Sequence, residues 1–477
     1  MKNIIIIFFI IVSIILFSNT EIYAEPQISD KSYSIKKIIG GLNFPTSMTI
    51  INDEILILEM SSGKILKIID NTISPLPLIE IPVAQPPCEC GLLGITSINN
   101  EVYVFYTDVS GNKENLTNIV AKYRYDGISL TDPIIIKKMP INEKYMLGGT
   151  MTTGVNDEIY FTTGDQYSLN EFSNFGIDKK MEVINIGPKK YHSIGNTDTG
   201  SIFKVSNGEV EHFAMGLRNS FGLAVDPITG NLWGTDNGPE IYDEINLIKK
   251  KFNGGWVILS GPTDRNDGYT NISEEFNLKI QYKDYEYSEP EFSFYVPIGI
   301  TAIEFPQGQS FEKYKDHVFV GDFNTGKIYK FNLNSNRDGF IFLENNLKDL
   351  VYDEGDKNDE IIFAKGIPGG ISDIVFKNDG MYILSIFEGS IYKISPKKIL
   401  LPLKEFETGA DLTGSDLSFV DLSGKDLTGV KLTGADLTGS DLSFVDLSGK
   451  DLSGVDLTDA ILINAKLNDC INHIICQ

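Results

Sequence analysis

The sequence predicts an all-β fold, most simply a six-bladed β-propeller, and three observations carry this prediction. The chain of 477 residues contains 44 glycines and 11% aromatic residues, a composition that suits short strands and tight turns better than helical bundles. Apolar runs alternate with Gly, Asn or Asp turns, as in EILILEMSSGKILKI (54–68), HVFVGDFNTGKIYKF (317–331) and GMYILSIFEGSIYKI (380–394). This theme persists over about 370 residues, and units of about 60 residues give six blades.

The N-terminus predicts export. It has one lysine, then an apolar run from Ile4 to Phe17, and a small residue at Ala24. A run of this length is short for a membrane span and suits a signal peptide over residues 1–24, cleaved after Ala24. Because Ile22 is bulky for a cleavage site, an uncleaved membrane anchor is the alternative. We therefore expect a secreted or extracytoplasmic protein, at a membrane only if this segment is retained.

Net charge and cysteine content limit the classes of binding partner and the compartment of the protein. The formal net charge of -24 argues against binding nucleic acid or an anionic membrane surface, because both would be repelled. Four cysteines suit an exported protein. Cys470 and Cys476 flank a short loop that a disulfide could close, whereas Cys88 and Cys90 lie too close together for an easy unstrained bridge. The second pair could instead bind a soft metal.

From Ala410 the sequence repeats a five-residue unit, ADLTG SDLSF VDLSG KDLTG, with leucine at every fifth position. It resembles the pentapeptide-repeat family, which implies a short right-handed quadrilateral β-helix over residues 405–469, followed by a tail at 470–477. In that fold the leucines point inward, and about three coils stack ~4.8 Å apart. Lys425 and Lys450 occupy inward positions, so their ammonium groups must reach solvent or a partner. The resemblance implies a stacking or protein-docking module.

The densest chemical signal lies between residues 200 and 257. Arg218 and Asn219 place a fixed cation beside an amide at a turn, and an arginine fork suits a carboxylate or quinone oxygen. The turn DNGP (236–239) exposes backbone carbonyls, and Asp243 and Glu244 follow closely. Carbonyl and carboxylate oxygens are what Ca²⁺ requires. Turns of this composition also occur where nothing binds.

These motifs belong to a longer ordered set: FPTSM (44–48), ECGLLGI (89–95), LGGT to EIYFTTGD (147–165), GLRNSFGLAVDPITGNLW (216–233), DNGPEIYDEINLI (236–248), NGGW (253–256) and PIGITAIEF (297–305). Together they resemble the soluble PQQ-dependent glucose/sorbosone dehydrogenase family, six-bladed propellers that hold the quinone over the end of the central channel. The resemblance implies such a propeller over residues 30–400. It also implies the cofactors PQQ and Ca²⁺ and a small sugar or polyol substrate.

The resemblance carries over contacts to the cofactor residue by residue. Arg218 and Asn219 match cofactor contacts, and Thr301 matches a hydroxyl residue that faces the cofactor. Glu89 stands where the family has a polar residue lining the pocket. These four residues are expected to surround the organic cofactor.

The resemblance also implies two calcium positions. Gly238 and Pro239 match the pair whose carbonyl oxygens bind the Ca²⁺ that polarises the quinone. Glu244 and the backbone of Gly254 match positions near a second, structural Ca²⁺.

The departures from the family are equally informative. The family's general base is the histidine of an H-x-G-G loop, and that position is Met146 here. A thioether cannot take a proton, a contribution that is typically worth about 10² to 10⁴ in rate. Cationic contacts to the quinone fall on Asn324, Gly370 and Ser372, beside the retained Asp373. Three cations that would face a tri-anionic cofactor are therefore absent.

Two residues are candidate replacements for the base. Glu89 would serve if burial raises its pKa, and His192 lies in a long polar loop. Two functions stay open. The first is an exported quinoprotein that oxidises sugar hydroxyls with PQQ and calcium. The alternative is a catalytically impaired, calcium-stabilised propeller that binds carbohydrate or protein.

Overall fold

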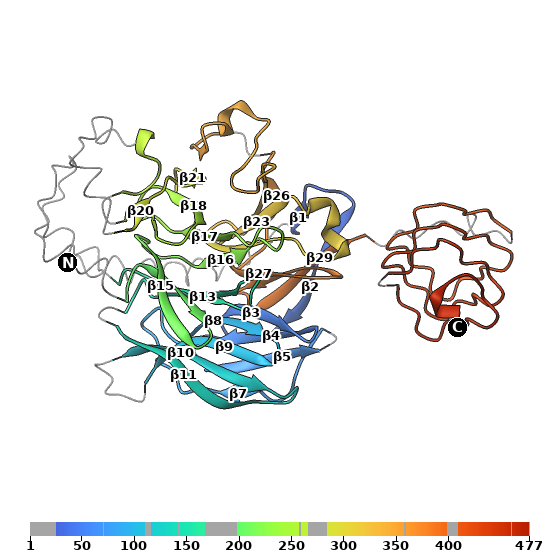
Figure 1. Cartoon of the computed structure of the whole chain (residues 1–477), viewed down its shortest axis with the longest axis horizontal. Coiled ribbons are helices and arrows are strands. Elements are labelled where there is room, and N and C mark those ends of the chain that lie inside the picture. Colours follow the sequence, from blue (N-terminus) through green and yellow to red (C-terminus); the bar gives the residue numbers. More distant parts are fainter. Residues whose placement is uncertain are drawn as a thin grey trace, which may run out of the picture.

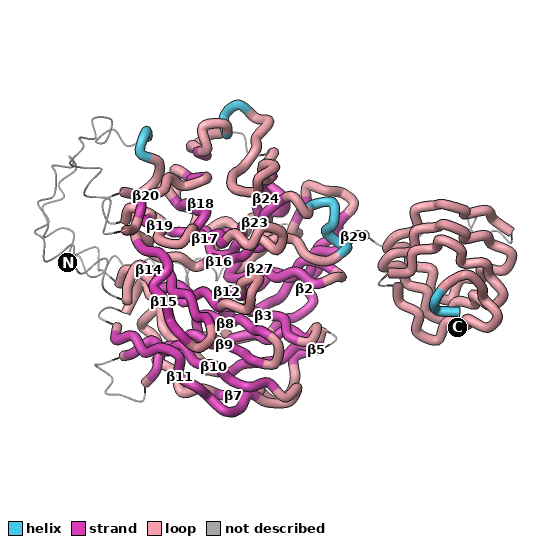
Figure 2. Tube along the Cα trace, in the orientation of Figure 1, coloured by secondary structure: helices cyan, strands magenta, loops and turns pink. Residues whose placement is uncertain are grey.

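The computed structural model of the chain consists almost entirely of β-strands and turns (Figures 1 and 2). It describes residues 25–69, 71–109, 116–141, 144–166, 198–256, 259–265, 284–356, 359–397, 409–458 and 460–476. The expected signal peptide and His192 lie outside these ranges. Helical segments in the described ranges are short 3-10 turns: Thr263–Arg265, Gln309–Tyr314, Asn345–Leu347 and Ile474–Cys476. None of them is long and apolar enough to cross a membrane.

The described strands form six sheets, confirming an all-β, propeller-like arrangement. The first sheet contains β3 (Pro45–Ile51), β4 (Glu54–Glu59), β5 (Lys64–Ile69), β6 (Thr72–Ile73) and β7 (Ile79–Glu80). The second contains β8 (Leu92–Ile98), β9 (Glu101–Asp108), β10 (Thr117–Tyr125) and β11 (Leu130–Pro140). The third contains β12 (Gly148–Thr153), β13 (Ile159–Thr163), β14 (Ser201–Ser206), β15 (Glu209–Met215), β19 (Phe252–Asn253) and β20 (Glu286–Tyr287).

The remaining sheets follow in chain order. The fourth contains β16 (Gly222–Val225), β17 (Leu232–Asp236), β18 (Asp243–Ile248), β21 (Phe292–Phe294) and β25 (Val351–Tyr352). The fifth contains β22 (Ile300–Glu304), β23 (His317–Asp322), β24 (Ile328–Asn332), β26 (Ile362–Lys365) and β1 (Gln27–Ile28). The sixth contains β27 (Ile371–Lys377), β28 (Gly380–Ser385), β29 (Ser390–Pro396) and β2 (Tyr33–Gly40).

The first strands of the sheets form a closed ring. Strands β3, β8, β12, β16, β22 and β27 each contact the next, and β27 contacts β3. Hydrogen bonds link the starts of these strands, for example Thr46 Oγ1 to Leu92 O (2.9 Å) and Thr301 Oγ1 to Ile371 O (2.5 Å). The second strand of each sheet runs back to the same end, as the Pro45–Glu59 pairing shows. We call this side, where the first strands begin, the loop end.

The ring is closed by the N-terminal part of the propeller-like unit. Strand β2 pairs antiparallel with β29 and completes the sixth sheet. Strand β1 likewise pairs with β26 at the edge of the fifth sheet. Segments from the two ends of this unit therefore share sheets.

Apolar side chains fill the space between neighbouring sheets. One cluster joins Trp233 and Phe292 of the fourth sheet to Val320 and Phe331 of the fifth, and all four are fully buried. This packing fixes each first strand against its neighbours and thereby positions the loops that precede it.

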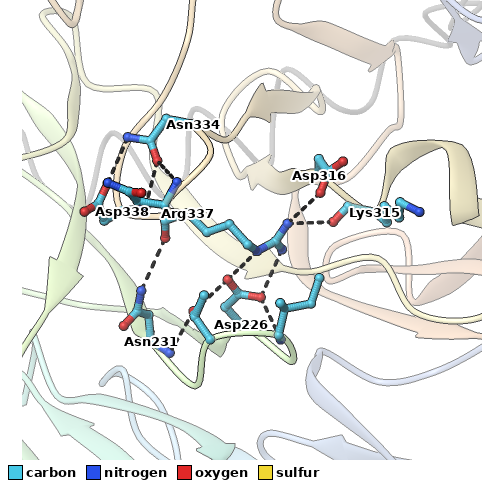
Figure 3. Close-up of polar contacts among 10 residues, drawn as sticks. Asp226, Asn231, Lys315, Asp316, Asn334, Arg337 and Asp338 are labelled. Atoms are coloured by element: carbon cyan, nitrogen blue, oxygen red, sulfur yellow. Dashed lines mark hydrogen bonds and ion pairs between the residues drawn. The ribbon is translucent and has the colours of Figure 1, made fainter.

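A buried ion pair supports the opposite end of the same two sheets (Figure 3). The Arg337 Nε donates to Asp226 Oδ2 at 2.6 Å and its Nη2 to Asp226 Oδ1 at 2.9 Å. Arg337 also contacts Asp316 at 3.0 Å. Burial tends to raise the pKa of Asp226, but the hydrogen bonds from Arg337 and neighbouring groups lower it overall. The pair ties the turn after β16 to the loop after β24.

The pentapeptide segment folds into stacked turns twenty residues apart. Parallel bridges join Asp416 to Asp436, and Asp436 to Asp456. Leu437 and Leu442 are fully buried, as expected for inward-facing repeat leucines.

Lys450 resolves the problem of a lysine at an inward position. Its Nζ donates to the carbonyl oxygens of Leu427 (2.7 Å) and Val430 (2.9 Å). The partly buried ammonium group is thus satisfied by backbone acceptors, and its partial burial lowers its pKa.

Both cysteine pairs have their sulfur atoms in bonding contact. Cys470 and Cys476 form the expected bridge, with Cα atoms 5.2 Å apart. Cys88 and Cys90, whose pairing the sequence left open, are also paired, with Cα atoms 5.1 Å apart. Their Cα separation lies within the range that a disulfide spans.

Candidate functional site

The Gly148-Gly149 loop at the start of β12 brings backbone close to its neighbours, as the sequence predicts. A Cβ on Gly148 (φ 63) would lie 2.7 Å from the backbone nitrogen of Gly164. The Gly149 N–H donates to Thr162 Oγ1 at 3.0 Å. Met146 precedes this loop with a φ of 56, a conformation that a side chain adopts only at some cost. The methionine therefore occupies a tightly defined position.

Glu89 lies directly beside Met146. Its Oε2 accepts the Met146 backbone N–H at 2.8 Å. Burial raises the pKa of Glu89, although hydrogen bonds from Met146 and Asn219 and the charge of Arg218 oppose the rise. The condition set for Glu89 as a proton acceptor is therefore met: a carboxyl group with a raised pKa stands next to the missing base.

Asp236 accepts hydrogen bonds from the backbone of Arg218 and Asn219, the two residues expected to contact the cofactor. Its Oδ2 accepts the Arg218 N–H and its Oδ1 the Asn219 N–H, both at 2.8 Å. The Asn219 Oδ1 in turn accepts the Gly148 N–H at 3.3 Å. The fold thus unites Glu89 with the adjacent pair Arg218 and Asn219, which lies far from it in the sequence.

The guanidinium group of Arg218 points at the DNGP turn. Its Nη1 donates to Asn237 O at 2.8 Å and to Gly238 O at 3.1 Å. Its Cζ also lies 5.7 Å from the centre of the Trp256 ring. One of the two carbonyls assigned by resemblance to the catalytic calcium is therefore already bonded to an arginine cation.

A small cavity lies beside Arg218, and its lining includes both residues that the resemblance assigns to the second calcium. Its volume is about 10 Å³, room for one water-sized particle. Its lining includes Asp236, Gly238, Glu244 and Gly254. Glu244 and Gly254, which the resemblance assigns to the second calcium, thus meet at one place with Gly238, which it assigns to the first.

The electrostatics of this cavity suit a cation. Burial, with a smaller contribution from Asp236, raises the pKa of Glu244 to about 8. Burial likewise raises the pKa of Asp236 to about 7. A divalent ion would offset the cost of burying the two negatively charged carboxylates. Carboxylate and carbonyl oxygens are also the ligands that Ca²⁺ prefers. The described residues contain no cluster of three or more His, Cys, Asp or Glu side chains arranged for a metal, so backbone oxygens would have to complete the shell.

Asp165 is a site residue to which the sequence analysis gave no role. Its Oδ2 accepts the Trp256 Nε1–H at 2.5 Å, and its backbone N–H donates to Arg218 O at 2.8 Å. The sequence contained a sign of this role, because Asp165 is the last residue of the TTGD motif at the end of β13.

The three positions without cations do not suit an anionic quinone. Gly370 has a φ of 74, and a Cβ there would lie 2.9 Å from Phe323 O and 3.3 Å from the Phe323 ring. Ser372 Oγ donates to Pro45 O at 3.1 Å, and Asn324 is exposed. A phenylalanine thus covers one of the expected cationic positions, and the residues present do not fit tri-anionic PQQ.

Thr301 lies in the central channel. Its hydroxyl donates to Ile371 O at 2.5 Å, so its hydrogen bond serves the contact between β22 and β27. The channel has a volume of about 310 Å³ and is lined by hydroxyl groups, together with the carboxyl groups of Glu304 and Asp373.

Comparison with known proteins agrees with the motif assignment. Residues 42–353 match the family model described as Glucose / Sorbosone dehydrogenase, and residues 408–443 and 435–471 match pentapeptide repeats. The chain is 29% identical over 281 residues to quinoprotein glucose dehydrogenase B of Acinetobacter calcoaceticus, covering 53% of this chain and 58% of that protein. It therefore spans less than two thirds of that relative.

Solved structures show a similar fold at low identity. The PQQ-bound aldose sugar dehydrogenase of Streptomyces coelicolor has a TM-score of 0.52 and 16% identity, over 76% of this chain and 98% of that one. The apo form of the soluble aldose sugar dehydrogenase of Escherichia coli has a TM-score of 0.54 and 18% identity, over 76% and 100%.

Proposed function

The chain belongs to the glucose/sorbosone dehydrogenase family, and on this premise we propose that its loop end binds a neutral sugar or polyol without PQQ-dependent oxidation. The observation that carries the proposal is the Phe323 ring packed over Gly370, where the family would place a cation. Met146 at the base position and the Arg218 guanidinium, bonded to two carbonyl oxygens, support it. What remains of the site is a set of hydrogen-bonding groups suited to hydroxyls.

A second candidate is the sugar oxidation named for the Acinetobacter relative, with Glu89 in place of the histidine. The contact between Glu89 and the Met146 N–H favours it, because this carboxyl group stands beside the position of the missing base. In this reading Glu89 takes the proton of a sugar hydroxyl.

One experiment separates the two. The protein is incubated with Ca²⁺ and PQQ, quinone and aldose binding are measured by calorimetry, and dye reduction is followed with the same aldoses. We expect aldose binding without quinone binding or dye reduction. Turnover that is lost in Glu89→Gln would overturn the proposal in favour of oxidation. Met146→His with PQQ should show no dye reduction, because the cationic side chains that would bind the quinone are still absent.

We also propose that the cavity at Glu244 holds a structural Ca²⁺. Calcium should raise Tm and chelation should lower it, because the ion offsets the repulsion between Glu244 and Asp236. Glu244→Gln should abolish the calcium response while sugar binding persists. Glu240→Gln, which removes an exposed carboxyl group of the same turn, is the matched control. An unchanged calcium response in Glu244→Gln would place the ion elsewhere.

The same proposal extends to architecture and location. The six sheets are the six blades of a propeller, and the stacked repeats are a right-handed quadrilateral β-helix that docks to a protein partner. The protein is exported, with cleavage after Ala24 or retention of residues 1–24 as a membrane anchor.

A further inference from the structure

Three phenylalanines gather at the loop end, one from the FPTSM motif and two from outside the family motifs. Phe44 precedes β3, Phe323 follows β23, and Phe387 follows β28. The ring centres of Phe44 and Phe387 lie 6.0 Å apart with ring planes at 89°, and those of Phe323 and Phe387 lie 5.1 Å apart with ring planes at 66°. The rings therefore meet edge to face and form an angled surface. Phe44 is 47% exposed and Phe387 is 54% exposed. We call this group the phenylalanine platform.

The backbone of Phe44 allows the platform to be tested cleanly. Its φ is 48, a left-handed conformation that is uncommon for a bulky side chain and that glycine adopts without strain.

The chemistry around the platform selects a neutral ligand. Phe323 covers Gly370, and its neighbour Asn324 offers an exposed amide where the family has a lysine. Glu388, next to Phe387, is paired with Lys37 at 3.0 Å, so this edge carries little net charge. An aromatic surface beside an amide matches a ligand with one apolar face and a polar edge.

We infer that Phe44, Phe323 and Phe387 form an angled aromatic surface that contacts the C–H face of a sugar ring, with Asn324 bonding a ring hydroxyl. A pyranose has such a face, with its hydroxyl groups projecting from the rim. The platform lies beside Asn324 and Gly370, two positions that the resemblance assigns to cationic contacts with the quinone. This inference rests on the proposed function, since it names how that site recognises a ring.

The test uses the full chain with two variants, Phe387→Ala and Phe44→Gly. Glycine accepts a positive φ without strain, so Phe44→Gly removes the ring and leaves the fold intact. Phe444→Gly is the matched control, because Phe444 has a φ of 62 and is 67% exposed in the pentapeptide segment. The probes are D-glucose, cellobiose and, as a polyol without a ring, glycerol. Binding is measured by calorimetry and by tryptophan fluorescence, since Trp256 is one of only two tryptophans.

We expect both platform variants to bind glucose and cellobiose about 3- to 10-fold more weakly, the range of an aromatic contact. Glycerol binding and Tm should be unchanged, and Phe444→Gly should bind like the wild type. If the wild type binds none of the probes, the proposed function fails and this inference with it. If the wild type binds glucose and both variants bind it equally well, the platform fails and the proposed function stands. If the platform instead binds a protein or another planar ligand, the wild type and both variants should bind glucose equally well.

Discussion

At the scale of single residues, the central channel contains two carboxyl groups away from the loop-end site. Burial, with a smaller contribution from Asp373, raises the pKa of Glu304 to about 8. Burial raises the pKa of Asp373 to about 6, against hydrogen bonds from the Met48 N–H and the Ser47 hydroxyl. The native state therefore holds protons that the unfolded chain has already released.

The sign of the pH dependence follows from these pKa values. Between the unfolded pKa of Glu304, about 4.3, and its native pKa, about 8, the native state binds more protons, so stability falls as pH rises. Glu304→Gln should flatten this fall, as measured by urea midpoints across the interval. Glu209→Gln, which removes an exposed carboxyl group, should leave it in place. An identical slope in Glu304→Gln and the wild type would contradict the assignment.

Met146 illustrates a different residue-scale point. The side chain expected to act as the base is replaced, while the backbone around it is kept, because Gly148 and Gly149 leave no room for another path. The backbone N–H of Met146 then serves as a donor to Glu89.

At the scale of elements, the junction between the fourth and fifth sheets depends on the Arg337–Asp226 pair. The side chain of Arg337 is 7% exposed and that of Asp226 is fully buried. Removing one partner leaves a buried charge uncompensated, which is far more destabilising than losing a surface pair.

Arg337→Ala should therefore lower the free energy of unfolding by about 3–5 kcal/mol. Arg124→Ala is the control: its pair with Asp132 has side chains 64% and 65% exposed and should contribute about 0–1 kcal/mol. Denaturant unfolding gives both values. The double variant Arg337→Met with Asp226→Asn should recover part of the loss, and comparable small effects of both alanine variants would rule out a structural role for the buried pair.

At the scale of the whole molecule, ring closure joins the two ends of the propeller-like unit. Strand β2 contributes the outer strand of the sixth sheet. Without it, β29 would present an unpaired edge that invites association with other chains.

Deleting residues up to 40 should accordingly lower the urea midpoint and promote aggregation. Deleting residues 409–477 should leave the midpoint of the propeller-like unit nearly unchanged, because all six of its sheets lie within residues 27–396. Unfolding and light scattering measure the two effects. The reverse order of sensitivity would show that the repeats, and not β2, stabilise the ring.

Much of the fold was predictable because its signals are local. Strand EILILE alternates with turns rich in glycine, and β4 (Glu54–Glu59) forms there. The five-residue leucine period likewise gave the buried column that includes Leu437. The pairing of Cys88 with Cys90 was left open, since spacing alone does not report the path of the backbone between two residues.

The site was predictable in part. The motifs assigned Glu244 and Gly254 to one calcium position and Gly238 to another, and all three line one cavity in the structure. They also singled out Glu89 as a carboxyl group of the pocket, and the structure places it against the Met146 N–H. They did not reveal the direction of the Arg218 side chain, the role of Asp165 or the phenylalanine platform. Each of these depends on which distant segment lies beside the residue.

The sequence by itself determined the strand-and-turn character, the repeat segment, the family and the residue types at every cofactor position. These properties follow from neighbouring residues, whose periodicity and turn chemistry act over a few positions. Only the tertiary structure decided that Arg218 bonds the Asn237 and Gly238 carbonyls, that Phe323 covers Gly370, and that burial raises the pKa of Glu89. Such properties depend on desolvation and on contacts between blades, which form only once remote parts of the chain have packed together.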